Sequence, residues 1–361
     1  MADPKSYTEH LSAVALQLEQ STTAAAQYAT AANLAPVLVR GLSLVSDYSP
    51  YIVLVRRRIE SRYGIATTDT ASALVDATNA QFLSTDTDKV IYNASTCRWG
   101  VVTAYVSTSQ ITLDHDLFPD GNEAYYMFNA GCMNSKQVNI SDFPGYTKVK
   151  SAEYPVGTPR YIDSDVNGIV EIGYDGGMPN SSSVADTSPD IIVHLYLKRR
   201  HFISQLTTFT GAVDLPAGYV AGSTSMVIDG LTTADVVKRG QPFTIAGVPG
   251  EYTVTDDVTV ADSHATVSFF PGLEVAATDD DAVTWVKSTL TPELEEIFDD
   301  WCSGKMMRNK SAVLGVKQFI NAANTVKASM DWANEVISDA EARLQQIALR
   351  NLVPIKVLAR M

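Results

Sequence analysis

Hydrophobic and polar positions predict helices at both ends of the chain and strands between them. From about Tyr7 to Ala32, apolar side chains recur among many alanines, and alanine has the highest helix propensity. Pro36 is expected to end this helix, and Ser49-Pro50 to begin another that ends near Gly64. Residues 1–66 are therefore predicted to form N-terminal helices.

From about Ser72 the pattern changes to short β-type runs separated by polar and glycine-containing turns, as in a small antiparallel sandwich or barrel. Two stretches, 67–132 and 211–288, show matching runs. These pair Ala73–Asp76 with Ser225–Asp229, Val90–Asn93 with Phe243–Ala246, Trp99–Thr103 with Tyr252–Thr255, Gln110–Leu113 with Ala265–Phe269, and Ala124–Met127 with Ala282–Trp285. We interpret them as two copies of one β module of about sixty residues. The alternative is two unrelated strand-rich stretches with similar turns.

Residues 133–210 are predicted to form a β-rich intermediate region. The run from Tyr161 to Ile172 alternates on both sides of Asn167-Gly168, and this dipeptide is a strong signal for a two-residue hairpin turn. The run from Ile191 to Leu197 indicates a further strand.

Residues 289–361 return to a helical pattern and end in an extended tail. Thr291 is the expected N-cap, with Pro292 at the first helical position and a break near Gly304. From about Lys310 to Leu352, apolar residues recur at steps of three and four. An unbroken helix over this stretch would reach about 60 Å, although the pattern leaves open whether it is one rod or two. The predicted fold class is α+β: a helical bundle formed by the N- and C-terminal helices, with inserted small antiparallel β modules that are sandwich- or barrel-like.

Composition and charge narrow the function classes. The chain has 361 residues, of which 45% are hydrophobic and 19% charged, as in folded globular proteins. Its formal net charge of −14 argues against wrapping nucleic acid, because that needs a positive surface. No run of about 18 apolar residues predicts a membrane span. The first residues lack a secretory signal pattern, so synthesis in the cytoplasm is expected.

Candidate chemistry is sparse, and no enzyme activity or cofactor is expected. The sequence contains no nucleophile elbow, phosphate-binding glycine motif or zinc-protease motif. Its three cysteines are far apart, and we interpret them as reduced packing residues. Asp163, Asp165 and Asn167 have the spacing of a calcium-binding loop, but Tyr174 stands where a bidentate Glu would be needed. An ordinary turn is the favoured interpretation, and these three residues remain a weak metal candidate.

Basic clusters and apolar stripes are the candidate interfaces. The densest basic patches are Arg56-Arg57-Arg58 and Lys198-Arg199-Arg200-His201, which suit acidic neighbours at a subunit interface. The alternative is a solvated helix face or intrachain ion pairs. The apolar interface candidates in the C-terminal region are Val313, Val316, Ile320, Val326, Val336, Leu344, Ile355, Val357 and Leu358. The helical members of this set could equally pack on the chain's own N-terminal helices.

Two segments carry a resemblance to a known class of proteins. The stretch from Arg239 to Val248, followed by Tyr252–Thr255 and Ala265–Leu273, resembles β modules in virion proteins of tailed bacteriophages. The segment Asp120–Tyr126 is similar. Together with terminal helices around β modules, the chain looks like a head-to-tail adaptor, also called a connector or neck protein.

The resemblance implies a structural virion protein located in the neck, below the portal. Such adaptors form a closed homo-oligomeric ring, usually of twelve copies, that contacts the portal and further neck or tail proteins. Their acidic channel lets DNA pass without specific binding. Here the tail from Val353 to Met361 would reach into the portal, because Pro354 ends the preceding helix. The alternatives are a tail-completion, collar or capsid-associated phage protein, or a carbohydrate- or cell-surface-binding β-module protein.

Overall fold

The chain is mostly β-structure. A computed structural model describes residues 4–18, 31–60, 62–143, 145–173, 192–317 and 323–352. Strands account for 36% and helices for 25%, so the predicted fold class, a helical bundle with small inserted β modules, is wrong. The β modules and the intermediate strands together outweigh the terminal helices, because several segments assigned to helix or left open are strands.

The chain forms two compact units. The first comprises Met1–Ile52, Pro144–Thr147 and Lys198–Met361, and the second comprises Val53–Phe143 and Lys148–Leu197. Residues 1–52, the predicted C-terminal helices and the second β module therefore belong to one unit. The first β module and most of the intermediate region belong to the other.

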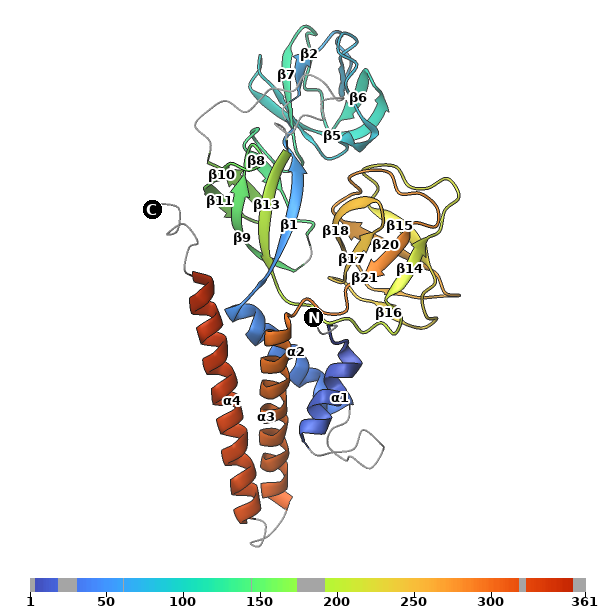
Figure 1. Cartoon of the computed structure of the whole chain (residues 1–361). Helices are drawn as coiled ribbons and strands as arrows, with labels where there is room; N and C mark the ends of the chain where they lie inside the picture. Colours follow the sequence, from blue (N-terminus) through green and yellow to red (C-terminus); the bar gives the residue numbers. More distant parts are fainter. Residues whose placement is uncertain are drawn as a thin grey trace, which may run out of the picture. The chain divides into compact units, whose positions relative to one another are not determined.

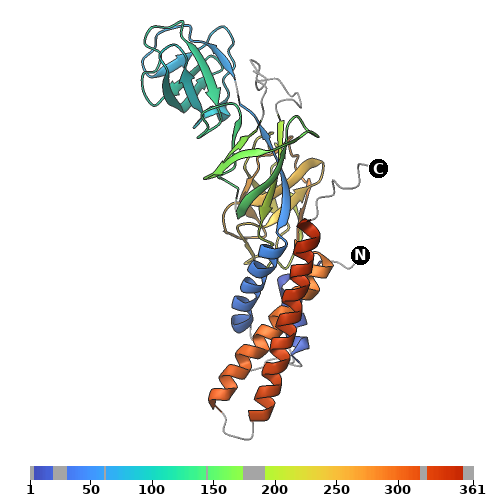
Figure 2. The ribbon, with the colours of Figure 1, turned by 90° about the vertical axis from the view of Figure 1, so that its left-hand side faces the viewer.

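The helices of the first unit come from both ends of the chain. They are α1 (Tyr7–Gln17), α2 (Ala31–Tyr48), α3 (Pro292–Lys317) and α4 (Ala323–Leu352). Helix α1 begins with a capping box between Ser6 and Glu9, and Thr291 accepts a hydrogen bond from the Leu294 backbone at the start of α3. Figures 1 and 2 show α3 and α4 side by side. The apolar repeat from Lys310 onward is thus divided between two packed helices.

Three predicted helix boundaries are wrong. Pro36 lies inside α2, where burial of Leu34, Val37 and Leu38 offsets the lost backbone hydrogen bond. Gly304 does not break α3 but brings α4 close, since an added Cβ would lie 2.9 Å from Ile337 Cγ1. The helix predicted after Pro50 is instead strand β1 (Tyr51–Arg58), whose buried positions alternate with exposed ones.

The first unit also contains a closed six-stranded barrel. Its strands are β14 (Thr210–Val213), β15 (Ser225–Asp229), β17 (Pro242–Ile245), β18 (Val248–Val254), β20 (Ala265–Phe270) and β21 (Ala282–Trp285). They follow the order β14-β15-β20-β18-β17-β21, and β21 pairs with β14. Strands β16 (Val236–Val237) and β19 (Val258–Thr259) form a separate two-stranded ribbon. Phe243 lies in the barrel core and contacts the rings of Tyr252, Phe269 and Trp285.

The second unit contains a related six-stranded sheet. Its strands are β2 (Tyr63–Ile65), β3 (Ala73–Val75), β4 (Val90–Asn93), β5 (Arg98–Ser107), β6 (Gln110–Leu113) and β7 (Ala124–Phe128), with the short 3₁₀ helix η1 (Ser84–Asp86) between β3 and β4. The order is β2-β7-β4-β5-β6-β3. Because β2 precedes residue 67, this module begins inside the region predicted to be helical.

The two β modules share one topology. In chain order, β14, β15, β17, β18, β20 and β21 of the barrel correspond to β2, β3, β4, β5, β6 and β7 of the sheet. Read in the opposite direction, the barrel has the order β14-β21-β17-β18-β20-β15. Replacing each strand by its counterpart gives β2-β7-β4-β5-β6-β3, which is the order of the sheet in the second unit. The described pairings in both modules are antiparallel. In the barrel, β14 pairs with β15. At the corresponding place in the second unit, just after β2, the Thr67 backbone N–H donates to the Val75 carbonyl of β3 at 2.7 Å. This common order supports the predicted repeat.

The remaining strands form two smaller sheets. One has the order β1-β13-β9-β10, with β9 (Tyr146–Glu153), β10 (Pro159–Arg160) and β13 (Ile192–Arg199). The other has the order β11-β12-β8, with β8 (Gln137–Asn139), β11 (Ile162–Val166) and β12 (Ile169–Ile172). The predicted hairpin at Asn167-Gly168 is confirmed, since Val166 pairs with Ile169 and both turn residues have positive φ.

Candidate functional site

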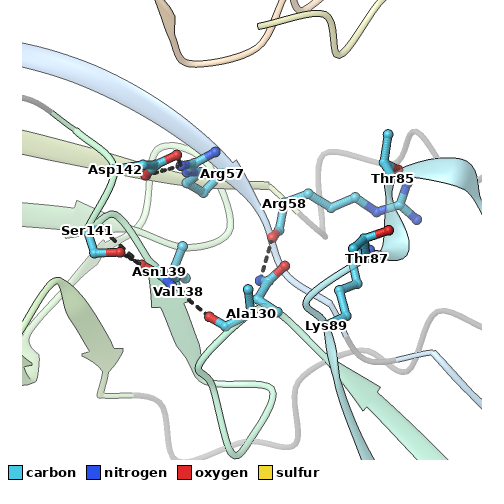
Figure 3. Close-up of a pocket in the computed structure, with 11 residues that line it drawn as sticks. Arg57, Arg58, Thr85, Thr87, Lys89, Ala130, Val138, Asn139, Ser141 and Asp142 are labelled. Atoms are coloured by element: carbon cyan, nitrogen blue, oxygen red, sulfur yellow. Dashed lines mark hydrogen bonds and ion pairs between the residues drawn. The ribbon is translucent and has the colours of Figure 1, made fainter. Parts of the chain in front are cut away.

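A basic cavity of about 390 Å³ lies within the second unit at the end of β1 (Figure 3). Its cationic side chains are Arg57, Arg58 and Lys89, and Asp142 is the acidic residue that lines it. The other lining residues are Thr85, Thr87, Asn129, Ala130, Val138, Asn139 and Ser141. The lining therefore carries a formal excess of two positive charges in a chain whose net charge is −14.

The two arginines reach the cavity where β1 ends. Val53 and Val55 are buried, and the side chains become partly exposed where the strand ends at Arg57 and Arg58. One guanidinium nitrogen of Arg57 donates to both carboxylate oxygens of Asp142, at 2.8 and 3.0 Å. The Arg58 carbonyl accepts a hydrogen bond from the Asn129 side chain at 3.1 Å. Figure 3 shows the Arg58 side chain extending toward Thr85 and Thr87.

Lys89 connects the cavity wall to a buried ion-pair cluster. Its Nζ lies 2.6 Å from a Glu60 oxygen and 2.9 Å from an Asp86 oxygen. Arg62, only 1% exposed, donates to both of these carboxylates and to the Gln81 carbonyl. Two cations thus face two anions, which balances the cluster formally. The cluster fixes the position of Lys89 at the cavity.

The cluster changes the acidity of its members. Burial alone would raise the pKa of Glu60, but Lys89 and Arg62 outweigh that effect and lower it to about 2. Burial disfavours the charged form of Arg62, yet the carboxylates of Glu60 and Asp86 raise its pKa above the ordinary value. Glu60 and Arg62 are therefore charged at neutral pH, and their ion pairs lie directly behind the wall of the cavity.

The chemistry of the cavity suits an anionic group. Its lining contains hydroxyl, amide, guanidinium and ammonium groups together with the carboxylate of Asp142. Guanidinium groups recognise carboxylates and phosphates through paired hydrogen bonds. The exposed Asp142 already engages Arg57 in this way, which indicates an acidic group as the kind of ligand that fits.

The weak metal candidate does not form a wrapped loop. Asp163 and Asp165 lie on β11, and Asn167 lies in the turn that follows. Asp165 accepts a hydrogen bond from the Val149 backbone at 3.2 Å. Across the described residues, no group of three or more His, Cys, Asp or Glu side chains is placed to hold a metal ion.

The three cysteines are free, in different environments. Cys132 and Cys302 are buried, as a packing role requires, and burial raises the pKa of the Cys132 thiol to about 12. Cys97 is exposed, so the interpretation of all three as packing residues is wrong at this position. Cys97 occupies a turn with positive φ.

The second basic patch is only partly a surface, since Arg200 is exposed and Lys198 half-buried while the other two residues are buried. Arg199 is 3% exposed and donates to the Gly240 carbonyl and to the Thr253 hydroxyl. His201 is 7% exposed, and both of its ring nitrogens lie at hydrogen-bond distance from oxygens of the first unit. These two residues therefore stabilise the first unit from within. By contrast, Arg56 is exposed on β1 beside the cavity arginines.

The C-terminal interface candidates fall into three groups. Leu344 is fully buried in the core formed by the four helices, so it packs within the chain, while Val336 is half-buried on α4. Val313 and Val316 lie on α3 and Val326 on α4, with side chains outside the description. Ile320, Ile355, Val357 and Leu358 lie outside the described residues.

Sequence reasoning found the arginines but missed the rest of the cavity. Thr85, Thr87, Lys89 and Asp142 belong to no local motif and reach Arg57 and Arg58 only through folding of the second unit. It also missed an exposed row of aromatic side chains on the first β module, which the alternation of Tyr92 and Tyr126 with buried neighbours could have indicated.

Comparison with known proteins assigns no family. No family model matches the chain, and no curated protein is significantly similar to it. Among the described helices, none is long and apolar enough to cross a membrane.

Proposed function

We propose that the chain is a structural subunit of a tailed-bacteriophage virion, a head-to-tail adaptor that assembles into a ring between portal and tail. The observation that carries the proposal is the length of the α3–α4 hairpin. These helices contain 26 and 30 residues, or about 39 and 45 Å. A rod of that length exceeds what a small helical core requires.

The helical core covers only one part of this hairpin. Its described members on α3 extend no further than Met307, and those on α4 begin at Ile337. Beyond these positions the two helices continue for at least ten residues, about 15 Å. On α4 the described side chains from Lys327 to Val336 are not part of the core shared with α1 and α2. On α4, Trp332 is 39% exposed and Leu349 is 64% exposed. They are two separate exposed positions, of which Trp332 lies in the part of α4 beyond the core.

The other features fit a scaffold that binds proteins. The lining of the basic cavity carries a formal excess of two positive charges, which suits an acidic side chain of a neighbouring subunit. The net charge of −14 suits a channel through which DNA passes without adhering. In this proposal twelve copies form the ring. The tail from Val353 to Met361, which lies outside the described residues, docks into the portal.

Mass photometry of the purified chain, alone and with the portal of the same phage, tests the proposal. We expect a ring, or a complex with the portal, and loss of that assembly when Trp332 and Leu349 are replaced by serine. The matched control is Val220→Ser, which removes an exposed apolar side chain (74% exposed) in the barrel region and should leave assembly intact. A chain that stays monomeric with and without portal would contradict the proposal.

Truncation after Asn351 separates folding from docking. The residues removed lie beyond the described helical core, so we expect circular dichroism and thermal unfolding to stay close to those of the full chain. Portal binding should be lost. Unchanged portal binding by the truncated chain would exclude the tail as the docking element.

A further inference from the structure

The outer face of the first β module carries a row of aromatic side chains that crosses four strands. Tyr63 pairs with Tyr126, Tyr126 pairs with Tyr92, and Tyr92 pairs with Trp99. The Tyr92 and Trp99 ring centroids are 4.5 Å apart, and those of Tyr63 and Tyr126 are 6.3 Å apart. Tyr63 is 43% exposed, while Tyr126 and Trp99 are each 36% exposed. We call these four residues the aromatic row.

The second copy of the module shows that the fold does not require this row. In the barrel, Thr210 pairs with Thr284, and Thr284 pairs with Thr244. These threonines are exposed on the strands that match β2, β7 and β4. Threonine suits an exposed strand position. The aromatic residues therefore need an explanation other than folding.

A hollow beside the row adds polar groups without adding charge. It measures about 340 Å³ and is lined by Tyr92, Trp99, Tyr126, Phe128, Met133, Asn134 and Ser135. None of these side chains carries a formal charge. Hydroxyl, indole N–H and amide groups at the hollow can donate and accept hydrogen bonds, while the ring faces offer apolar contact. The surface thus favours a neutral ligand that has both apolar faces and hydroxyl groups.

The dimensions favour a narrow ligand over a globular partner. With 36–43% exposure, the three most exposed rings offer roughly 300 Å² for contact. A stable protein interface needs about 800 Å² from each partner. Neighbouring strands are about 4.8 Å apart, which matches the length of one pyranose unit in an extended glycan. The apolar C–H face of a pyranose can stack on an aromatic ring.

We propose that the aromatic row is a binding site for a neutral oligosaccharide, with successive sugar rings stacking across the strands and their hydroxyls bonded at the hollow. This site is independent of the proposed virion role. It places sugar recognition on the first module and not on the second.

Isothermal titration of the full chain with cellohexaose, maltohexaose and chitohexaose tests the site. We expect binding of at least one of these sugars, and at least about tenfold weaker binding by a Trp99→Ala, Tyr126→Ala variant. Thr244→Ala, Thr284→Ala changes exposed positions on the barrel strands that match β4 and β7, and it should leave binding unchanged. Trp99→Phe keeps a ring and should retain most of the affinity.

Two results would overturn the proposal. One is the absence of binding to all three sugars at millimolar concentration. The other is sugar binding that the Trp99→Ala, Tyr126→Ala variant retains in full. Mass photometry of the same variant distinguishes a protein interface from a sugar site. If the unmodified chain binds no sugar and the variant has a changed oligomeric state, the aromatic row belongs to a protein interface instead. Circular dichroism of the variant checks that its fold is retained when these partly exposed side chains are removed.

Discussion

Replacing Arg62 with methionine tests whether the buried ion-pair cluster holds the second unit together. The Arg62 side chain makes two hydrogen bonds to Glu60, at 2.9 and 2.8 Å, and two to Asp86, at 3.0 and 2.5 Å. A fifth bond, of 2.6 Å, reaches the Gln81 carbonyl. Methionine fills similar space but leaves both carboxylates with Lys89 as their cation in the cluster. Breaking one partner of a buried pair costs about 3–5 kcal/mol, and we expect a loss of that size.

Hydrogen exchange followed by mass spectrometry measures this loss in the full chain. Peptides from β4 and β5 should show a lower free energy of opening, while peptides from α3 in the other unit should be unaffected. The control is Lys238→Met, which removes an exposed ion pair with Asp257 and should change the opening free energy by less than about 1 kcal/mol. Adding Glu60→Gln to Arg62→Met should recover part of the loss, because one uncompensated charge is removed. A loss below about 1 kcal/mol for Arg62→Met would refute the reasoning.

Two further predictions concern pH and helix packing. The pKa of Glu60 falls from 4.5 to about 2 on folding, so its contribution of roughly 3 kcal/mol is present above pH 4.5 and is lost as the pH falls toward 2. Hydrogen exchange of β4 across this range should show the loss, and Glu60→Gln should lack it. Gly304→Val should destabilise the α3–α4 contact by about 1–3 kcal/mol, because an added Cβ would already lie 2.9 Å from Ile337 Cγ1 and 3.1 Å from the Ala333 carbonyl. Thermal unfolding measures this effect, with Ala342→Val at an exposed position of α4 as the control, and an unchanged midpoint for Gly304→Val would contradict it.

Local signals in the sequence predict the elements that depend on local geometry. The Asn167-Gly168 turn is identifiable because both residues adopt positive φ at low cost. The start of α3 is identifiable because Thr291 and Pro292 satisfy the first helical turn. Ser49-Pro50 also resembles a helix start, and for this reason the sequence wrongly predicts a helix where β1 lies. The alternation of buried Val53 and Val55 with exposed neighbours is the stronger signal.

Long-range contacts set the parts that the sequence could not reveal. The run Arg56-Arg57-Arg58 stands out locally, but its acidic partner Asp142 lies 85 residues from Arg57. In the buried cluster, Arg62 and Asp86 are 24 residues apart, and η1 brings them together. The same limit applies to Arg199 and His201 in the run Lys198–His201, because distant residues bury them. Nothing in that run indicates that Arg199 is enclosed by the backbone at Gly240 and the side chain of Thr253.

The two copies of the β module keep similar inward-facing residues on their strands but differ in their outward-facing residues. On a strand, alternate side chains face opposite sides of the sheet, so the apolar residues that fix the fold constrain only the inward positions. Both copies keep these apolar, with Ile91 and Tyr125 buried in one and Phe243 and Val283 in the other. The outward positions are free to differ, and at matching sites one copy has aromatic rings where the other has threonines. The shared topology explains why the inward-facing residues are apolar in both copies. We therefore expect chemistry specific to one module at the outward-facing residues, where the copies differ.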